Sequence, residues 1–469
     1  MDTKERMAIP RQKPTELPAA ARITNFSEVV SGFDEKTALL EAERCLQCKK
    51  PKCREGCPIH NDIPAFIRLL REGRIKEAYW KDRETNSLPA ICSRVCPHEF
   101  QCEGHCIRGK KGEAVAIGML ERFLVDWMVT NKKSLLQPCA LPKGKKVAIV
   151  GSGPAGMSVA YYLAHEGYHC TIFESLPVLG GMLAVGIPAY RLPREIINAE
   201  FEALRSCGVS VVTGVTIGKD KTLEDLKKEG FSAVFLGPGA HLSRKLGVEG
   251  EDLAGVVHGV DYLRKINVGE AMNLGKNVVV VGGGNVAIDC ARTALRTGSD
   301  NVFILYRRTK AEMPASQAEI HHLEEEGVRI EMLAAPVKVH GENGRLTRIE
   351  CIRMELGECD ASGRCRPVPK EGSNFMIEAD AIIPAISQDV DARTPGAGQE
   401  LKLSRWGTYE VDEQTLQTSE PWIFAAGDAV LGPQTVAKAV YQAKEAAESI
   451  KRFLEGADLR EGRQPFALE

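Results

Sequence analysis

Short apolar runs alternate with helical patterns along most of the chain beyond about residue 145. The run from Lys146 to Val150 ends in a glycine, a helical pattern follows, and a second apolar run ends at Glu174. The same succession recurs from Lys276 to Tyr306. Short apolar runs separated by helices are typical of parallel strands buried on both faces. The pattern therefore predicts two βαβ units.

The region before residue 145 has a helical pattern and no strand-like alternation. From Asp34, a predicted N-cap, the run Glu35 to Gln47 has an apolar face and delivers Cys45 at its end. Further helical patterns lie at 63–71, 75–83 and about 114–128. Residues 1 to about 33 are polar and contain three prolines. We expect them to form an extended arm that lies on a neighbouring domain or subunit.

Other strand patterns lie on either side of the second βαβ unit. A helix to about Cys207 and two short strands near Val209 and Ala233 follow the first unit, and strands run from 336 to 383. A last short strand precedes Asp428, and a helix extends from about Thr435 to residue 453.

Composition and charge exclude several classes of protein. The 469 residues carry a formal charge of −2 and a pI near 6.6, so the chain lacks the charge excess of a nucleic-acid-binding protein. No apolar run reaches the ~18 residues of a membrane span, and the N-terminus is charged rather than signal-like. We expect a cytoplasmic protein with no nucleic-acid partner and no membrane span.

Glycines at the first strand end predict a dinucleotide site. Gly151 suits the tight turn, Gly153 lets the backbone approach a pyrophosphate, and Gly156 allows close packing of helix on strand. The helix that begins at Pro154 and Ala155 offers free N–H groups to the phosphates. Glu174 is placed to accept hydrogen bonds from ribose hydroxyls. A Gly-x-Gly-x-x-Gly alone also occurs in ordinary turns, but strand, helix, second strand and terminal acid together are specific.

The second unit repeats this design with a different terminal charge. Gly282 and Gly284 precede Asn285-Val286-Ala287, with alanine in the close-packing position. Its second strand ends in Arg307 and Arg308, where the first unit has an acid. Paired guanidinium groups can bind a 2′-phosphate with charge-assisted hydrogen bonds. This favours NADP(H) over NAD(H), while the alternative is a solvated basic pair at a strand end.

Further glycines and one acid suggest a second ligand-facing region. Gly180, Gly181 and Gly239 indicate backbone close to a ligand, although tight turns explain them equally well. Gly427-Asp428 ends a short strand, and an Asp there can hydrogen-bond a ribityl chain. A helix N-terminus near Thr435 can stabilise negative charge on a reduced flavin.

Eight of the 15 cysteines fall between Cys45 and Cys106. Their order is C-x2-C-x4-C-x3-C-P, then Cys92-x3-Cys96-Pro97, Cys102 and Cys106. A Cys-Pro pair that closes an irregular run is typical of bacterial ferredoxins, whereas zinc sites usually carry paired C-x2-C or histidine half-sites. We predict two 4Fe–4S clusters, with zinc or unliganded thiols as the alternatives. Three later cysteines, Cys351, Cys359 and Cys365, are expected to be loop or core thiols rather than a redox pair.

These motifs together resemble one family. The cysteine groups, Gly151–Gly156, Gly186-Ile-Pro-Ala-Tyr-Arg-Leu-Pro193, Gly282–Ala287, Tyr306-Arg-Arg-Thr309 with Glu312-Met-Pro314, and Ala426-Gly-Asp428 are similar to the small subunit of NADPH-dependent glutamate synthase. Its relatives include the NADP-binding subunit of NADH-dependent ferredoxin:NADP⁺ oxidoreductase (sulfide dehydrogenase alpha subunit), which the chain resembles most, and the N-terminal half of dihydropyrimidine dehydrogenase.

The resemblance implies a fold class and domain limits. It implies an all-α domain with two 4Fe–4S clusters, then an α/β flavoprotein with a Rossmann-like FAD domain and an inserted NADPH domain. We expect the arm and cluster domain at 1–140, the FAD domain at 141–274 and 385–469, and the NADP(H) domain at 275–384.

Ligand sets also follow from the resemblance. One cluster is expected on Cys45, Cys48, Cys53 and Cys106, and the other on Cys57, Cys96, Cys102 and a non-cysteine ligand matched by Glu121, with Cys92 a spare thiol. Without the resemblance, Glu121 reads as an exposed helix residue. Expected cofactor contacts are Gly151, Gly153, Pro154, Ala155, Gly156, Glu174, Gly180, Gly181, Met182, Arg191, Gly239, Gly427, Asp428 and Thr435 for FAD, and Gly282, Gly284, Asn285, Val286, Arg307 and Arg308 for NADP(H).

The implied activity is electron transfer between NADP(H), FAD and two clusters, without an acid–base residue. No reactive cysteine pair follows the first unit, and nothing in the chain provides amidotransferase chemistry. We expect a subunit that works with a second flavoprotein or synthase subunit, with ferredoxin, or with both, in a hetero-oligomer, and electron bifurcation is one form that this activity can take. The alternatives are the small subunit of NADPH-dependent glutamate synthase and a non-catalytic redox sensor or relay.

Overall fold

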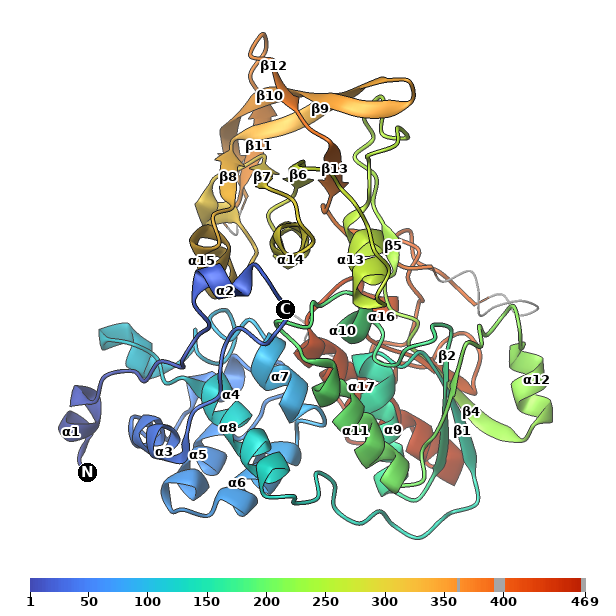
Figure 1. The fold of residues 1–469 in the computed structure, drawn as a ribbon. Coiled ribbons are helices and arrows are strands. Elements are labelled where there is room, and N and C mark those ends of the chain that lie inside the picture. The colour runs from blue at the N-terminus through green and yellow to red at the C-terminus, as the bar shows by residue number, and fades with distance from the viewer. Residues whose placement is uncertain (361–362, 392–400, 465–469) are drawn as a thin grey trace.

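The computed structural model describes residues 1–360, 363–391 and 401–464, which form three units (Figure 1). A helical unit comes first, and strands begin only at Lys146. Its helices are α3 (Glu35–Glu43), α4 (Lys52–Glu55), α5 (Ile63–Arg71), α6 (Ile75–Arg83), α7 (Pro89–Val95), the 3-10 helix η1 (Ile107–Lys111) and α8 (Ile117–Thr130).

Apolar residues three and four positions apart give these helices a buried stripe. Phe66 and Leu70 of α5 and Leu120 and Leu124 of α8 are fully buried in one core. Asp34 caps α3 by accepting a hydrogen bond from Thr37. The predicted helices at 63–71 and 75–83 are confirmed, whereas α3 ends four residues earlier than expected, at Glu43, and Cys45 follows it. The short helices α4 and α7 were not predicted.

A five-stranded parallel sheet forms the second unit, in the order β15-β4-β1-β2-β3. Its strands are β1 (Lys146–Val150), β2 (His169–Glu174), β3 (Ser210–Thr213), β4 (Phe231–Leu236) and β15 (Ile423–Ala425). The helices of this unit are α9 (Pro154–His165), α10 (Met182–Val185), α11 (Arg194–Ser206), α12 (Leu223–Lys228), α16 (Asp428–Leu431) and α17 (Val436–Glu455). Since β15 pairs with β4, the end of the chain completes a sheet that begins near residue 146.

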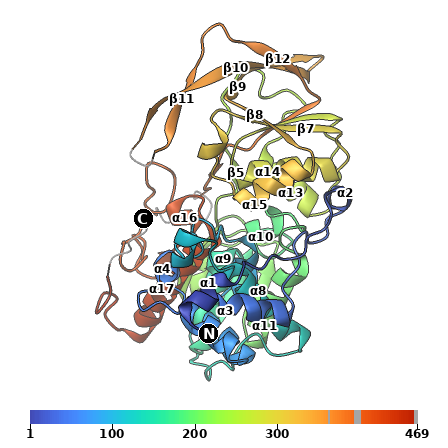
Figure 2. The ribbon, with the colours of Figure 1, turned by 90° about the vertical axis from the view of Figure 1, so that its left-hand side faces the viewer.

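A four-stranded parallel sheet, β13-β6-β7-β8, forms the third unit. It contains β6 (Asn277–Val281), β7 (Asn301–Tyr306), β8 (Arg329–Met332) and β13 (Ala381–Pro384), with α13 (Gly259–Asn267), α14 (Asn285–Arg296), the 3-10 helix η2 (Lys310–Glu312) and α15 (Gln317–Glu325). Antiparallel strands β9 (Ala334–Glu342), β10 (Arg345–Cys359), β11 (Cys365–Pro369) and β12 (Phe375–Glu378) lie at the end farthest from the helical unit (Figure 2).

The chain crosses between the two parallel sheets at a two-stranded pair, β5 (Leu242–Ser243) with β14 (Gln388–Asp389). Helix α13 precedes residue 275, the predicted start of the inserted domain, and its Tyr262 and Leu263 pack in the core of the second sheet. The boundary at 275 stays a prediction, because it was placed where the βαβ pattern begins, at Lys276.

The N-terminal arm is less extended than expected. It contains two short helices, α1 (Thr3–Ala8) and α2 (Ala19–Arg22), and α2 lies beside α15 of the inserted unit (Figure 1). Within the described residues, no helix is both long and apolar enough to cross a membrane.

Candidate functional site

One cavity of about 540 Å³ is lined by residues from all three units. Thirteen of the predicted cofactor residues line it, namely Gly151, Gly153, Pro154, Ala155, Glu174, Gly181, Met182, Arg191, Gly239, Asp428, Thr435, Asn285 and Val286. Residues of both glycine motifs therefore face the same space. The predicted residues outside its lining are Gly156, Gly180, Gly427, Gly282, Gly284, Arg307 and Arg308.

The glycines of the first motif differ in what surrounds them. A Cβ atom on Gly151 would lie 2.3 Å from the carbonyl oxygen of Gly237, and one on Gly156 would lie 2.0 Å from that of Gly151. At Gly153, the N-cap of α9, no atom lies within 4 Å of such a Cβ. The first two positions therefore allow tight packing, while Gly153 leaves the helix N-terminus open to an anionic group in the cavity.

The Glu174 carboxylate is buried and held by its neighbours. Its Oε2 accepts hydrogen bonds from the backbone N–H (2.9 Å) and hydroxyl (2.5 Å) of Ser152, and its Oε1 accepts from the Ser175 hydroxyl (3.2 Å) and Leu176 N–H (2.9 Å). These four bonds fill the lone-pair sites of the carboxylate, so a ribose hydroxyl would bind Glu174 by replacing one of the two serine hydroxyls. The Ser152 hydroxyl also accepts from Gly180 N–H at 2.9 Å. Sequence reasoning missed Ser152, because it occupies a variable position of the motif.

Asp428 and Thr435 also line the cavity. Asp428 follows Gly427, which has a φ of 71°, and burial raises the pKa of Asp428 to about 6. Thr435 caps the 20-residue helix α17, whose N-terminus faces the cavity and favours negative charge there. Gln101 of the helical unit donates to the Thr435 hydroxyl at 3.3 Å.

Arg191 lines the cavity but already has two partners. Its Nη1 lies 2.8 Å from Asp289 of α14, and its Nε lies 3.3 Å from Glu319 of α15. Arg191 therefore joins the first sheet unit to the second, a role that sequence reasoning missed. Its contact with FAD stays a prediction.

The second glycine motif repeats the packing of the first. A Cβ atom on Gly282 would lie 2.4 Å from the carbonyl oxygen of Ala385, and Ala287 is fully buried. Gly284 is the N-cap of α14, and the nearest atom to a Cβ there is 3.9 Å away. The N-terminus of α14 is therefore also accessible to an anionic group.

Three arginines gather at the end of β7. Burial, then the neighbouring guanidinium groups of Arg308 and Arg364, lower the pKa of Arg307. Neither Arg307 nor Arg364 forms an ion pair with another described residue. Guanidinium groups that lie close together without a carboxylate partner are the arrangement expected of a site that binds an anion. Sequence reasoning missed Arg364, which lies in the β10–β11 hairpin. Only the folded hairpin brings this residue close to Arg307.

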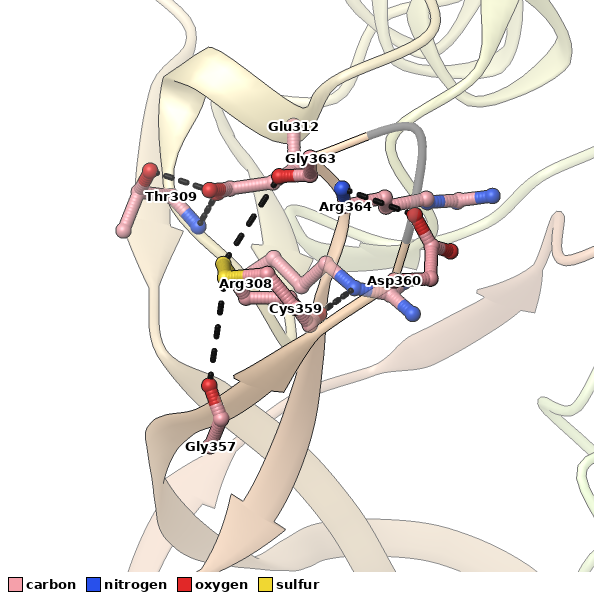
Figure 3. Close-up of a disulfide and its surroundings, with 9 residues drawn as sticks. Arg308, Thr309, Glu312, Gly357, Cys359, Asp360, Gly363 and Arg364 are labelled. Atoms are coloured by element: carbon pink, nitrogen blue, oxygen red, sulfur yellow. Dashed lines mark hydrogen bonds between the residues drawn. A yellow bond between two sulfur atoms is a disulfide. The ribbon is translucent and has the colours of Figure 1, made fainter.

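A disulfide closes this hairpin, which corrects the expectation that Cys359 and Cys365 are loop or core thiols. The strand register sets the two cysteines directly opposite each other, which their spacing in the sequence does not reveal. Arg308 Nε donates to the carbonyl oxygen of Cys365 at 2.8 Å (Figure 3). The hairpin therefore fixes the position of Arg308. Cys351 is a buried core thiol, as expected.

The four cysteines predicted to hold the first cluster line a small cavity in the helical unit. Its lining contains Cys45, Cys48, Cys53 and the distant Cys106. Burial raises the pKa of Cys53 to about 12 and also raises the pKa of Cys45 and Cys48. Thiolates in this cavity therefore require a compensating cation, and sulfur donors suit iron–sulfur clusters.

The second predicted set includes Glu121, which is 7% exposed rather than a surface residue. Its Oε1 accepts a hydrogen bond from Asn86 at 2.7 Å. Burial, then Asp82 and Cys96, raise the pKa of Glu121 well above its usual value. Glu121 in turn contributes to the raised pKa values of Cys57 and Cys102, after burial as the largest cause. The structure thus brings the carboxylate and the three cysteines of this set together.

Cys96 of the second set lies close to the large cavity. Its neighbours in the chain, Val95 and Pro97, both line the cavity. Sequence reasoning identified the Cys96-Pro97 pair but not that residues beside it face this cavity. It also missed His241, a lining residue whose pKa burial lowers.

Two family descriptions match the chain. Residues 22–133 match dihydropyrimidine dehydrogenase domain II, 4Fe-4S cluster, and residues 145–443 match pyridine nucleotide-disulphide oxidoreductase. The chain is therefore an oxidoreductase of the two-dinucleotide-domain class with an N-terminal iron–sulfur domain. These descriptions imply FAD or NADP binding and a 4Fe–4S cluster.

The chain belongs to the family of the glutamate synthase small chain, which confirms the resemblance seen in the sequence. It is 35% identical over 457 residues to the Glutamate synthase [NADPH] small chain of Azospirillum brasilense, covering 94% of each chain. It is 45% identical over 431 residues to the NADPH-Fe(3+) oxidoreductase subunit beta of Geobacter sulfurreducens (strain DL-1 / KN400), covering 86% of this chain and 63% of that one. This chain thus spans less than two thirds of that relative's length.

A solved structure supports the fold. FprA from Mycobacterium tuberculosis (His57Gln mutant) is 20% identical, with a TM-score of 0.57 over 70% of this chain and 88% of that one. The relatives named above are described as a subunit beta and a small chain.

Proposed function

We propose that this protein moves electrons between NADP(H) and a partner through FAD and two 4Fe–4S clusters. The observation that carries the proposal is the single cavity shared by both glycine motifs and by the neighbours of Cys96. Nucleotide, flavin and cluster sites that meet at one cavity support electron transfer without a diffusing intermediate.

The chain's own residues suit both nucleotides. Gly153, Glu174, Asp428 and the N-terminus of α17 suit FAD, because they offer backbone N–H groups, acceptors for hydroxyls and a field that favours negative charge. Gly284 and the arginines at the end of β7 suit NADP(H). When bound, a flavin would supply the conversion of one two-electron hydride transfer into two single-electron transfers.

We assign the two clusters to the two ligand sets in the helical unit. The first takes Cys45, Cys48, Cys53 and Cys106, which share a cavity. The second takes Cys57, Cys96, Cys102 and Glu121, which lie close enough to perturb one another's pKa values. Cys92 remains a buried thiol beside Cys96. Because Val95 and Pro97 face the flavin cavity, the second cluster is the one that exchanges electrons with FAD.

The partner is proposed to be a second flavoprotein subunit, a ferredoxin, or both. NADPH-Fe(3+) oxidoreductase subunit beta is 45% identical to this chain, which favours a role as the NADP-linked subunit of a larger oxidoreductase. The alternative is service to a separate glutamate synthase chain, which the match across 94% of the Azospirillum brasilense small chain favours.

The test uses protein purified anaerobically without added metals. We expect one FAD and about eight iron atoms per chain, and bleaching of the flavin absorbance within one rapid-mixing experiment with NADPH but not with NADH. Bound zinc without iron would refute the clusters. A flavin that stays oxidised after NADPH addition would leave only the non-catalytic relay.

A further inference from the structure

Three side chains outside the sites above converge where the interdomain linker crosses two helix ends. Cys139 lies in the linker between α8 and β1, His165 is the last residue of α9, and Cys207 caps α11. One ligand atom from each lies within 4.8 Å of the other two. Figure 1 shows this linker running along the lower edge of the molecule from α8 to β1.

His165 is oriented as a ligand. Its Nδ1 lies 2.8 Å from the carbonyl oxygen of Tyr161, an acceptor, so Nδ1 carries the proton. Its Nε2 is buried and has no hydrogen-bond partner. Histidines that bind metals commonly donate from one nitrogen to a backbone carbonyl and coordinate through the other. A buried nitrogen lone pair without a partner is otherwise costly.

The backbone around the three side chains favours a cation. The helices α9 and α11 both end here, and helix C-termini carry partial negative charge. The carbonyl oxygen of Gln137 lies 3.9 Å from the Cys207 sulfur. The linker is held in place by hydrogen bonds from Ala140 N–H to the carbonyl oxygen of His165 (3.1 Å) and from Lys143 N–H to that of Gly167 (2.8 Å).

The structure joins Cys139 and Cys207 in a disulfide, a state that leaves Nε2 of His165 unused. A chain that carries 4Fe–4S clusters, as proposed above, works under reducing conditions, where thiols persist, and the Cys359–Cys365 pair is expected to be reduced there as well. The two sulfurs are bonded to each other here, so after reduction they have to move apart only to the spacing of about 3.8 Å set by a shared zinc ion, with Nε2 of His165 already beside them.

We propose that Cys139, His165 and Cys207 bind one Zn²⁺ ion when the two sulfurs are reduced. A dithiol or phosphine reductant gives the disulfide two electrons, water or the dithiol supplies two protons, and two thiols form. Zn²⁺ then displaces both thiol protons as it binds. Water or the Gln137 carbonyl oxygen takes the fourth position of the tetrahedron. Because none of the three residues lines the flavin cavity, the ion is structural and clamps the linker to the FAD-binding unit.

The experiment compares full-length wild-type protein with Cys207→Ser, His165→Gln and the control Cys359→Ser, whose cysteine pair has no histidine ligand beside it. Each protein is purified anaerobically, treated with a phosphine, and titrated with Zn²⁺ against a chelator. We expect about one high-affinity zinc in wild type and control, and affinity weakened by roughly 10- to 100-fold or more in the two site variants. Zinc-edge X-ray absorption should show two sulfurs at about 2.3 Å and nitrogen or oxygen at about 2.0–2.1 Å.

Equal zinc binding by wild type and both site variants would overturn the proposal. So would an intact bond between Cys139 and Cys207, found by mass spectrometry of alkylated peptides from anaerobic cells. Flavin and iron contents equal to wild type show that a variant is folded, and His165→Gln replaces Cys207→Ser if the latter is not. Failure of this proposal can be told apart from failure of the proposed function. If the eight clustered cysteines held zinc instead of iron–sulfur clusters, the number of zinc ions per chain would rise equally in wild type and in every variant.

Discussion

At the scale of residues, the choice between NADPH and NADH is proposed to depend on Arg307 and Arg308 at the end of β7. Replacement of both Arg307 and Arg308 by Ala is expected to weaken NADPH binding by about 2–4 kcal/mol, because two charge-assisted hydrogen bonds to the 2′-phosphate are lost. NADH, which lacks that phosphate, should bind as before. Arg364→Ala should weaken NADPH binding by only roughly 1.5- to 5-fold, since its side chain is exposed.

Equilibrium titration of each variant with both nucleotides measures these differences. Arg329→Ala is a matched control, because Arg329 is an exposed arginine at the opposite end of the same sheet. Equal losses for NADPH and NADH in the double variant would contradict the 2′-phosphate role.

Glu121 offers a second test at the same scale. Glu121→Ala removes the only carboxylate of the second ligand set, so we expect an altered EPR signal for one cluster and an unchanged signal for the other. The net charge at a cluster is one determinant of its potential, so the altered cluster should also show a shifted reduction potential. Glu84→Ala is the control, because Glu84 is an exposed acid at the end of α6 whose only ion-pair partner in the described part of the chain is Lys81. A wild-type spectrum in Glu121→Ala would return the carboxylate to a purely structural role beside Asn86.

At the scale of elements, a buried ion pair docks the helical unit on the first sheet unit. Arg83 of α6 donates to Glu200 of α11 at 2.8 and 3.2 Å, and the two side chains are 2% and 1% exposed. Glu200→Ala leaves the Arg83 guanidinium buried without its partner. We expect a loss of about 3–5 kcal/mol, and a smaller loss when both residues are replaced by Leu.

Denaturation with guanidinium, followed by circular dichroism, provides the measurement. Glu202→Ala on the exposed face of the same helix, where Glu202 pairs with Arg205, should change stability little. A double Leu variant less stable than Glu200→Ala would show that the pair itself, rather than the stranded charge, supplies the stabilisation.

Local patterns determined which elements the sequence could predict. Helices α5 and α6 were predicted to the residue, because each has one apolar stripe and clear ends. The βαβ units and Glu174 were accessible for the same reason, since strand, turn and acid lie within one short stretch. The assignment of α13 was not accessible, because that helix belongs to the inserted unit only through the packing of Tyr262 and Leu263 on a sheet that begins later.

The parts of the candidate site that the sequence did not reveal depend on distant contacts. Arg364 lies near Arg307 because the register of β10 and β11 sets Cys359 opposite Cys365. Arg191 is engaged by Asp289, almost a hundred residues later in the chain. Ligand sets for the clusters came from the family resemblance, since eight irregularly spaced cysteines allow many pairings.

At the scale of the whole molecule, the N-terminal arm contacts all three units. Val29 N–H donates to the carbonyl oxygen of Tyr190 in the first sheet unit at 3.0 Å. Arg122 of α8 donates to the carbonyl oxygen of Val30 at 2.8 Å. In the inserted unit, Arg296 donates to the carbonyl oxygen of Asn25 at 3.1 Å. The arm therefore holds the inserted unit in a fixed orientation towards the flavin cavity.

Arg22 joins the N-terminal arm to the inserted unit. It is 4% exposed and forms ion pairs with Glu16 (2.9 Å) and with Glu325 of α15 (2.7 Å). Arg22→Ala frees the inserted unit on this side without touching either glycine motif. We expect NADPH to bind with nearly unchanged affinity but to reduce the flavin more slowly, by up to about 100-fold, because a displacement of about 1 Å between reacting groups has costs of that size. Stopped-flow flavin bleaching at saturating NADPH measures the rate. Lys310→Ala serves as the control, because it removes an exposed ion pair to Glu324 of α15, the helix that Arg22 also contacts.

A faster rate in Arg22→Ala would contradict this prediction. It would mean that the arm holds the inserted unit away from the orientation in which hydride transfer occurs.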